Sequence, residues 1–190
     1  MATPVIVLRA VALLAFAGPM LLGVSGRRAY RKTQRQPGGD QAPVVANFAA
    51  FAVFFPSLLL FSGSSEGATA LLLGSLGSLM AVAGATLVLR SRAELGSAWS
   101  FVPKADQGTG LVTTGPYHLV RHPIYLGLAV LATGQALAFS SWAALSIVLC
   151  GIIPTFAWRA RAEETLLGQT FGENHAIYKK QTKMIIPHFL

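Results

Sequence analysis

Long uncharged stretches of apolar residues set the first constraint on what this chain can fold into. Residues 4–24 form a run interrupted only by Arg9, and two further runs follow at about residues 44–61 and 68–89. About 20 apolar residues in a helix cross the roughly 30 Å of a bilayer's hydrocarbon. Each run therefore predicts a membrane-spanning helix, although a signal peptide cleaved near residues 15–17 is the alternative for the first.

A fourth apolar stretch, residues 124–158, is too long for a single crossing. One helix of this length would measure about 52 Å. Ser140 and Ser141 lie near its middle, so we expect a hairpin of two helices of about 16 and 17 residues, with a kink at Pro154 in the second. The sequence thus predicts an all-α integral membrane protein of about five transmembrane helices that ends in a C-terminal helical hairpin.

The charges are few and unevenly placed. Only 12% of residues are charged, against roughly 25% in soluble domains, and most basic residues lie at 27–35, 90–121 and 159–183. Five crossings that start outside put these segments in the cytoplasm, with Arg9 as the exception. We expect the inner membrane, the N-terminus outside and the C-terminus in the cytoplasm. Basic residues dispersed between apolar runs do not predict a nucleic-acid partner.

Several common chemistries have no support in the sequence. Cys150 is the only cysteine, which argues against a cysteine-based zinc site. The four histidines do not form a ligand pattern, and no phosphate-binding loop or serine-hydrolase motif is present. No metal site is expected.

Two polar segments flank the predicted hairpin: GPYHLVRHP at 115–123 and WRARAEETLLGQTFGENHAIYKK at 158–180. Both fall on the same membrane face, so we expect them to meet. Pro123 suits the first turn of a helix, which puts Arg121 and His122 at its N-terminus, where a carboxylate or phosphate is stabilised. The alternatives are an Arg121 that anchors the helix in the headgroups and a His122 that merely caps it.

The second polar segment carries acidic residues close to the hydrocarbon. Arg159 and Glu163 are four residues apart on one helical face, and a surface ion pair is the simplest interpretation. Glu163 and Glu164 at this depth are costly unless they face a partner. A cationic ligand would offset that cost.

Together these segments resemble the superfamily of isoprenylcysteine carboxyl methyltransferases and phospholipid (phosphatidylethanolamine) N-methyltransferases. The resemblance rests on the blocks G-x-Y-x-x-x-R-H-P-x-Y-x-G and E-E-x-x-L-x-x-x-F-G, followed by Y-K-K and a late proline. It implies one methyltransferase domain over residues 1–190. Within it, residues 1–108 would supply the N-terminal transmembrane helices and a loop, and residues 109–190 the cofactor-binding core.

The resemblance further implies an enzyme that uses S-adenosylmethionine to methylate a lipidic substrate, with a cytoplasmic cofactor pocket. Glu163 or Glu164 would accept from the cofactor's ammonium or ribose, while Arg121 and His122 would hold its carboxylate. The cofactor-binding residues expected on these grounds are Gly115, Tyr117, Arg121, His122, Pro123, Tyr125, Glu163 and Glu164. The catalytic residues expected are Arg159, Glu163 and His175.

The methyl acceptor stays open between a phospholipid amine and a prenylcysteine carboxylate, with a slight preference for the amine because such lipids are abundant. The number of methyl groups transferred, the general base and the oligomeric state are not readable. The same blocks also resemble sterol reductases that use NADPH, but those have about twice as many spans as the five counted here. A small non-enzymatic membrane subunit is the third alternative.

Overall fold

The computed structural model describes residues 3–30, 42–63, 67–96 and 110–186. Within these ranges there is no strand apart from one isolated bridge, which confirms the all-α prediction. The basic segments at 27–35 and 90–121 lie partly outside the described residues. The elements are α1 (Thr3–Tyr30), α2 (Ala42–Leu60), α3 (Gly67–Leu95), the 3-10 helix η3 (Gly115–His118), α4 (Pro123–Ala138), α5 (Trp142–Ile147), the π-helix η4 (Val148–Ile152) and α6 (Ile153–Gln181).

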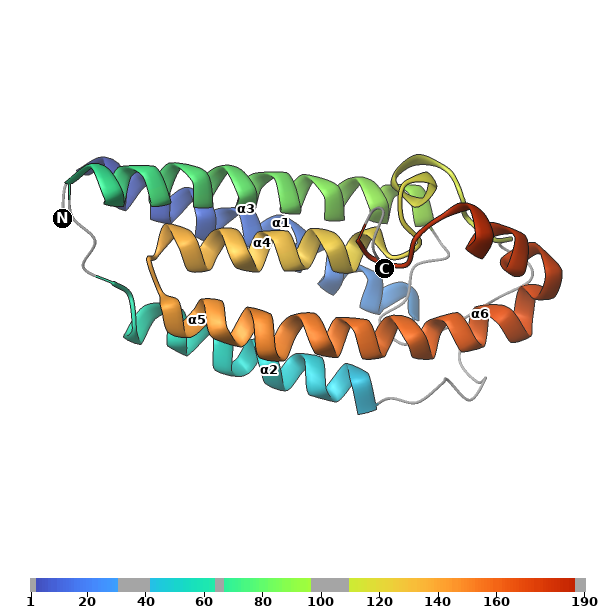
Figure 1. Ribbon diagram of the computed structural model, residues 1–190. Helices are drawn as coiled ribbons and strands as arrows, with labels where there is room; N and C mark the ends of the chain where they lie inside the picture. The colour runs from blue at the N-terminus through green and yellow to red at the C-terminus, as the bar shows by residue number, and fades with distance from the viewer. Residues whose placement is uncertain (1–2, 31–41, 64–66, 97–109, 187–190) are drawn as a thin grey trace.

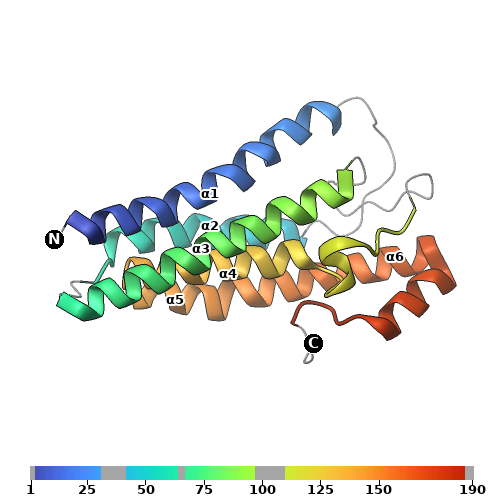
Figure 2. The same cartoon turned by 90° about the horizontal axis from the view of Figure 1, so that it is seen from above.

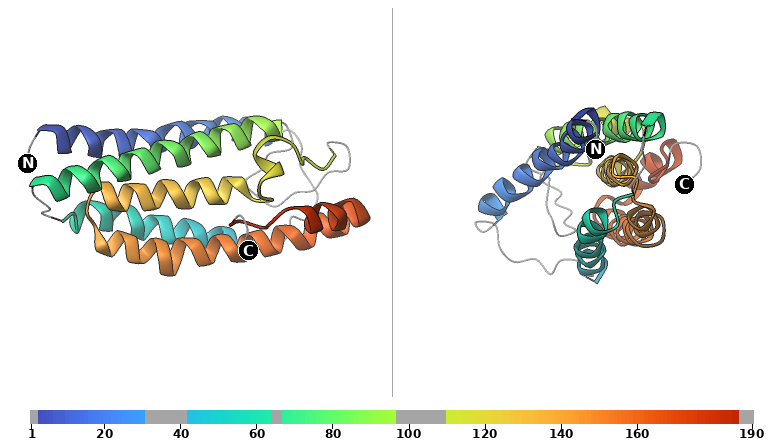
Figure 3. Two further views of the ribbon diagram at one scale, coloured as in Figure 1. Left: turned by 45° about the horizontal axis from the view of Figure 1, so that its top comes forward. Right: turned by 90° about the vertical axis from the view of Figure 1, so that its left-hand side faces the viewer.

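The helices run along one common axis, with α1, α3 and α4 on one side and α2, α5 and α6 on the other (Figure 1). Seen from above, α1 diverges from its neighbours toward its C-terminal end (Figure 2). The start of α1 and the turn between α4 and α5 lie at one end, here called the Arg9 end. The start of α4 lies at the opposite end, called the Arg121 end, where α6 projects beyond the other helices (Figure 3).

Three helical stretches in the described ranges are long and apolar enough to cross a membrane: Ala42–Leu60, Gly67–Leu95 and Trp142–Gln181. Thr3–Pro19 and Pro123–Ala138 are shorter apolar helices. All five predicted crossing segments are therefore helical, and the fold-back at Ser140 and Ser141 is confirmed. The number of crossings stays a prediction.

The predicted helix ends are wrong in three places. α1 continues to Tyr30 and α3 to Leu95, past the apolar runs 4–24 and 68–89 that predicted them. The second hairpin helix does not stop near Trp158, and from Trp142 to Phe171 it spans about 45 Å. Apolar runs end where the hydrocarbon ends, whereas helical hydrogen bonding continues through strong helix formers such as alanine, arginine, glutamate and leucine.

Glycines let α3 and α4 approach closely. A Cβ on Gly84 would lie 2.5 Å from the carbonyl oxygen of Gly127, and one on Gly77 would lie 2.5 Å from that of Gly134. Neither position has room for a side chain, because the obstacle is backbone. This seam fixes α4 against α3 along its length.

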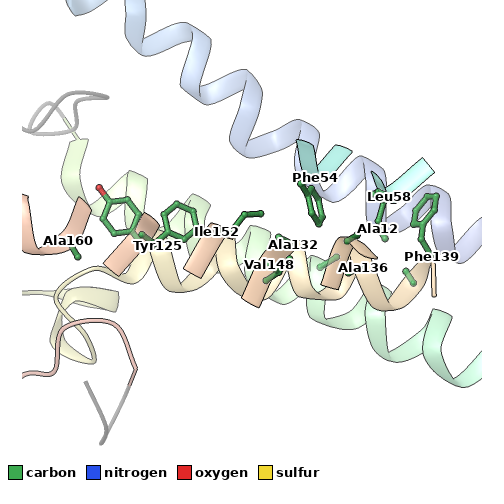
Figure 4. Close-up of a cluster of buried hydrophobic side chains, with 14 residues drawn as sticks. Ala12, Phe54, Leu58, Tyr125, Ala132, Ala136, Phe139, Val148, Ile152 and Ala160 are labelled. Atoms are coloured by element: carbon green, nitrogen blue, oxygen red, sulfur yellow. The ribbon is translucent and has the colours of Figure 1, made fainter. Parts of the chain in front are cut away.

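The apolar core lies between α4 and the pair α2 and α6 (Figure 4). Phe54 and Phe156 are almost completely buried there, and the ring of Phe156 stacks on that of Tyr125 with centroids 5.1 Å apart. The π-helix directly precedes Pro154, which cannot donate a helical hydrogen bond. The kink expected at Pro154 stays a prediction.

Arg9, the exception in the charge count, is buried at its own end of the bundle. Its Nε donates to the carbonyl of Ala138 at 3.2 Å, and its Nη2 donates to Gly63 and Phe139 at 3.2 and 3.4 Å. Two of these carbonyls close the C-terminal end of α4, which carries partial negative charge and unpaired acceptors. Arg9 therefore ties α1 to α4 and to the end of α2.

Candidate active site

The segment before α4 and the segment after α6 lie side by side at the Arg121 end. The backbone N–H of Arg121 donates to the carbonyl of Lys183 at 2.8 Å, and that of His122 donates to Met184 at 2.9 Å. Val120 forms a parallel bridge with Lys183. Backbone hydrogen bonds therefore hold these two parts of the chain together, and the predicted contact between the polar segments is confirmed.

α6 reverses direction at Gly172, whose φ of 51° and ψ of −120° interrupt the helix. Glycine adopts a positive φ without the steric cost of a Cβ. The residues beyond it run back toward α4 (Figure 1). His175 Nε2 and Lys179 Nζ consequently lie 3.8 Å from the two carboxylate oxygens of Glu164.

Arg121 and Glu164 form the centre of the site. The Nε of Arg121 donates to Oε1 of Glu164 at 2.6 Å and its Nη2 donates to Oε2 at 3.1 Å, which is the two-pronged geometry of a strong ion pair. Nη1 donates to the carbonyls of Lys179 and Thr182. Arg121 is only 8% exposed, so it is not a headgroup anchor.

His122 lies between two carboxylates. Its Nε2 is 3.2 Å from Glu164 and its Nδ1 is 3.5 Å from Glu163. Burial alone would lower the pKa of His122, but the hydrogen bonds and negative charges of the two glutamates outweigh it and raise that pKa. Both ring nitrogens can donate only in the imidazolium, so the geometry suits the charged form.

Glu163 has its own partners. It accepts hydrogen bonds from the hydroxyl of Tyr125 and from Nε of Arg159, the latter at 3.3 Å. The guanidinium of Arg159 also lies over the ring of Tyr125, 5.4 Å from its centroid. The predicted pair of Arg159 and Glu163 thus exists, but it faces α4 rather than solvent.

η3 closes the site from the other side. The carbonyl of buried Tyr117 accepts a hydrogen bond of 2.6 Å from the hydroxyl of Tyr178 on the returning part of α6. Burial, followed by nearby negative charge, raises the pKa of the Tyr117 phenol, which therefore stays neutral. Gly115 begins η3 with a φ of +57°, and the carboxylate of Glu94 occupies the space where a Cβ would project.

A family model described as phospholipid methyltransferase matches residues 72–174, more than half of the chain. The chain belongs to the phospholipid methyltransferase family. The match starts within α3 and ends just past the reversal at Gly172, so the predicted division at residue 108 is not tested by it.

Two similar curated proteins are both described as protein-S-isoprenylcysteine O-methyltransferase. The one from Schizosaccharomyces pombe is 30% identical over 103 residues, covering 52% of this chain and 44% of its own. The one from Saccharomyces cerevisiae is 30% identical over 135 residues, covering 70% of this chain and 55% of its own. This member of the phospholipid methyltransferase family spans about half the length of these relatives.

A solved structure with the same fold is that of the eukaryotic intramembrane Ras methyltransferase ICMT (isoprenylcysteine carboxyl methyltransferase). It superposes with a TM-score of 0.57 at 21% identity, covering 78% of this chain and 54% of the solved one. Together with the long apolar helices, this likeness identifies the family member as an integral membrane protein.

In this phospholipid methyltransferase family member, the cluster around the two glutamates contains most of the residues predicted from sequence. Arg121, His122 and His175 face Glu164, while Arg159 faces Glu163. Pro123 opens α4, and its buried ring sets the helix start beside the cluster.

Sequence reasoning missed the residues that close the cluster from behind. Tyr178, Lys179 and Thr182 all contact the site, and Glu94 supports η3. Tyr178 and Lys179 had a signal in the Y-K-K block. Glu94 had none, because its partner Thr114 is 20 residues away in the sequence. No group of His, Cys, Asp and Glu that could hold a metal occurs among the residues the structure describes, and the expectation of no metal stays a prediction.

Proposed function

We propose that this chain is a membrane methyltransferase that moves a methyl group from S-adenosylmethionine to the carboxylate of a prenylcysteine-like lipidic acceptor. Family membership and the names of both curated relatives support methyl transfer. The carboxylate is supported by the charge balance of the cluster, which is the observation that carries the proposal.

The residues present suit S-adenosylmethionine, which supplies an electrophilic methyl group on a sulfonium. His175 Nε2 is buried and makes no hydrogen bond within the described chain, although Glu164 lies 3.8 Å away. An unpaired buried donor or acceptor indicates a site that accommodates another polar partner. Glu164 would take the ammonium or a ribose hydroxyl, and Arg121 with His122 would take the carboxylate.

Positive charge exceeds negative charge around the two glutamates. With His122 protonated, four basic groups face the two carboxylates. These groups are Arg121, His122, Arg159 and Lys179. Both glutamates are already engaged, so neither is set up as a base that removes a proton from an amine, whereas a carboxylate acceptor is ionised at pH 7 and needs no base.

Arg159 is the residue we assign to the acceptor. It lies between the cluster and the apolar core, held by Glu163 and by the face of Tyr125. Its planar fork matches a carboxylate. Phe156 stacks behind Tyr125 and keeps water from that side, so these residues would orient the acceptor and exclude water rather than exchange protons.

The test combines binding with turnover. S-adenosylmethionine should raise the melting temperature of the purified protein, whereas NADPH should not. Stabilisation by NADPH would favour the sterol-reductase alternative. If neither compound stabilises the protein, the non-enzymatic alternative is favoured. Labelled methyl should then appear on a prenylcysteine analogue. If methyl appears only on phosphatidylethanolamine, the proposal of a carboxylate acceptor is refuted.

The second candidate acceptor, a phospholipid amine, is favoured by the description of the family model. It requires a base, and His175 is the buried histidine whose Nε2 makes no hydrogen bond with the residues that the structure describes. If the amine is the acceptor, His175→Gln should abolish transfer and leave cofactor binding intact.

We further infer that the Arg121 end faces the cytoplasm, because described basic residues such as Arg90, Arg121 and Arg159 lie on the helices toward that end. In a Cys150→Ala background, cysteine at position 180 should resist an impermeant thiol reagent applied to intact cells. Cysteine at position 66 should react. The reverse pattern would put the site outside.

A further inference from the structure

The returning part of α6, the residues after it and Leu119 in the segment before α4 carry exposed side chains that the proposed chemistry does not use. They combine two lysines with three large aliphatic side chains, which are 40–66% exposed. We call this set the return surface. Its members are Leu119, Ile177, Lys180, Lys183 and Ile186.

The lysines of this surface lack acidic neighbours. Lys179 is engaged with Glu164, but neither Lys180 nor Lys183 forms an ion pair with any residue that the structure describes. The exposed Glu173 lies two helical turns from Lys180 on the same helix. Two lysines without acidic partners, next to exposed aliphatic side chains, indicate a surface made for an anionic and partly apolar partner.

The return surface lies beside the start of α4, although part of α6 projects beyond it. The chain comes back from Gly172 until Met184 and Ile185 pack against the apolar core, beside the first turn of α4 (Figure 3). Trp158, 45% exposed, lies on α6 one residue before Arg159, where a tryptophan typically marks the bilayer interface. The lysines are therefore carried back to headgroup depth.

We propose that anionic phospholipid headgroups of the adjacent leaflet bind the return surface through Lys180 and Lys183, with Ile177, Ile186 and Leu119 in contact with the upper acyl chains. Lysines near an anionic leaflet gain attraction that depends on its charge, and aliphatic neighbours add burial. This docking is independent of whether the chain transfers methyl groups.

Docking also reaches the site through the backbone. The carbonyls of Lys179 and Thr182 hold the guanidinium of Arg121, and that of Lys183 accepts from its N–H. Headgroups that immobilise the return surface therefore also restrict the motion of Arg121, the ion-pair partner of Glu164. Anionic lipid is in this way a regulator of the proposed function.

Hydrogen exchange of residues 173–186 tests the docking without reference to activity. The full chain is compared in nanodiscs of phosphatidylcholine and of phosphatidylcholine with phosphatidylglycerol. Phosphatidylglycerol should slow exchange in this segment several-fold. The double variant Lys180→Gln with Lys183→Gln should lose that protection, since each lysine near the surface accounts for about a fivefold change in affinity.

The matched control removes two positive charges elsewhere, at the exposed positions Arg90 and Arg161. Arg90→Gln with Arg161→Gln should keep the protection. Equal loss in both double variants would reduce the effect to general attraction and overturn the proposal, as would no response to phosphatidylglycerol. If inorganic phosphate slows exchange in nanodiscs of pure phosphatidylcholine, the return surface binds free phosphate and the proposal of lipid docking is overturned.

Discussion

Two arginines of this bundle are equally buried, each 8% exposed, at opposite ends. Arg9 donates to backbone carbonyls of Gly63, Ala138 and Phe139, and its guanidinium lies 5.3 Å from the ring centroid of Phe139. Arg121 forks onto the carboxylate of Glu164. The guanidinium of Arg9 is paired mainly with carbonyls at a helix end, whereas that of Arg121 is paired with an ionised side chain.

The difference separates a structural role from a chemical one. Carbonyls at a helix end keep the same charge at every pH and offer nothing to a ligand. The carboxylate of Glu164 contacts several basic side chains, and these contacts can rearrange when a charged ligand binds. The side chains are Arg121, His122, His175 and Lys179. Depth of burial alone does not distinguish the two ends.

The largest effect should follow from breaking the Arg121 end. Glu164→Gln leaves Arg121 buried without its counter-charge and should reduce the free energy of unfolding by about 3–5 kcal/mol. Unfolding in mixed detergent and SDS micelles measures it. The exposed Glu173→Gln should stay within about 0.5 kcal/mol of wild type; similar losses in both variants would contradict a central ion pair.

Breaking the Arg9 end should have a smaller effect of a different kind. Arg9→Met removes charged donors from buried carbonyls, which should cost about 1.5–3 kcal/mol. S-adenosylmethionine affinity should stay near wild type, because the contacts described for Arg9 lie at the opposite end from the site. Arg9→Lys should recover part of the stability. A large loss of S-adenosylmethionine affinity in calorimetry would show that Arg9 affects the distant site, which contradicts a purely structural role.

The glycine seam connects both ends, so it supplies a reference of purely steric origin. Gly84→Ala places a Cβ 2.5 Å from backbone atoms of α4 and should destabilise by about 1–3 kcal/mol. Gly151→Ala is the control, because its nearest neighbours are side-chain carbons at 3.8 and 3.9 Å. If the two substitutions cost the same, α3 and α4 do not pack as described.

The smallest effect is a dependence of stability on pH that only the Arg121 end should show. Folding raises the pKa of His122, so its contribution is complete below the unfolded value near 6.5 and is lost as pH rises through the folded one. Melting temperatures from pH 6 to 9 should therefore fall less for His122→Gln than for wild type. Arg9→Met should keep the wild-type slope.

Local patterns predicted the parts of the molecule that depend on neighbours in sequence. Apolar runs located the helices, and the spacing of Arg159 and Glu163 gave a pair that exists. The reversal at Gly172 was not predicted, since one glycine is tolerated in a helix and only distant contacts, such as Tyr178 with Tyr117, hold the turn back. The burial of Arg9 was not predicted, because its partners Ala138 and Phe139 lie about 130 residues away in the sequence.

The reversal at Gly172 also imposes an order on biosynthesis. Every apolar helical stretch of the described ranges lies before Gly172 in the chain, so each one leaves the ribosome before the residues that close the site. Insertion and site completion are therefore separate events in time. A chain that ended at residue 172 would still carry all of these helices, yet Glu164 and Arg121 would lack the carbonyls of Lys179 and Thr182 that complete their surroundings.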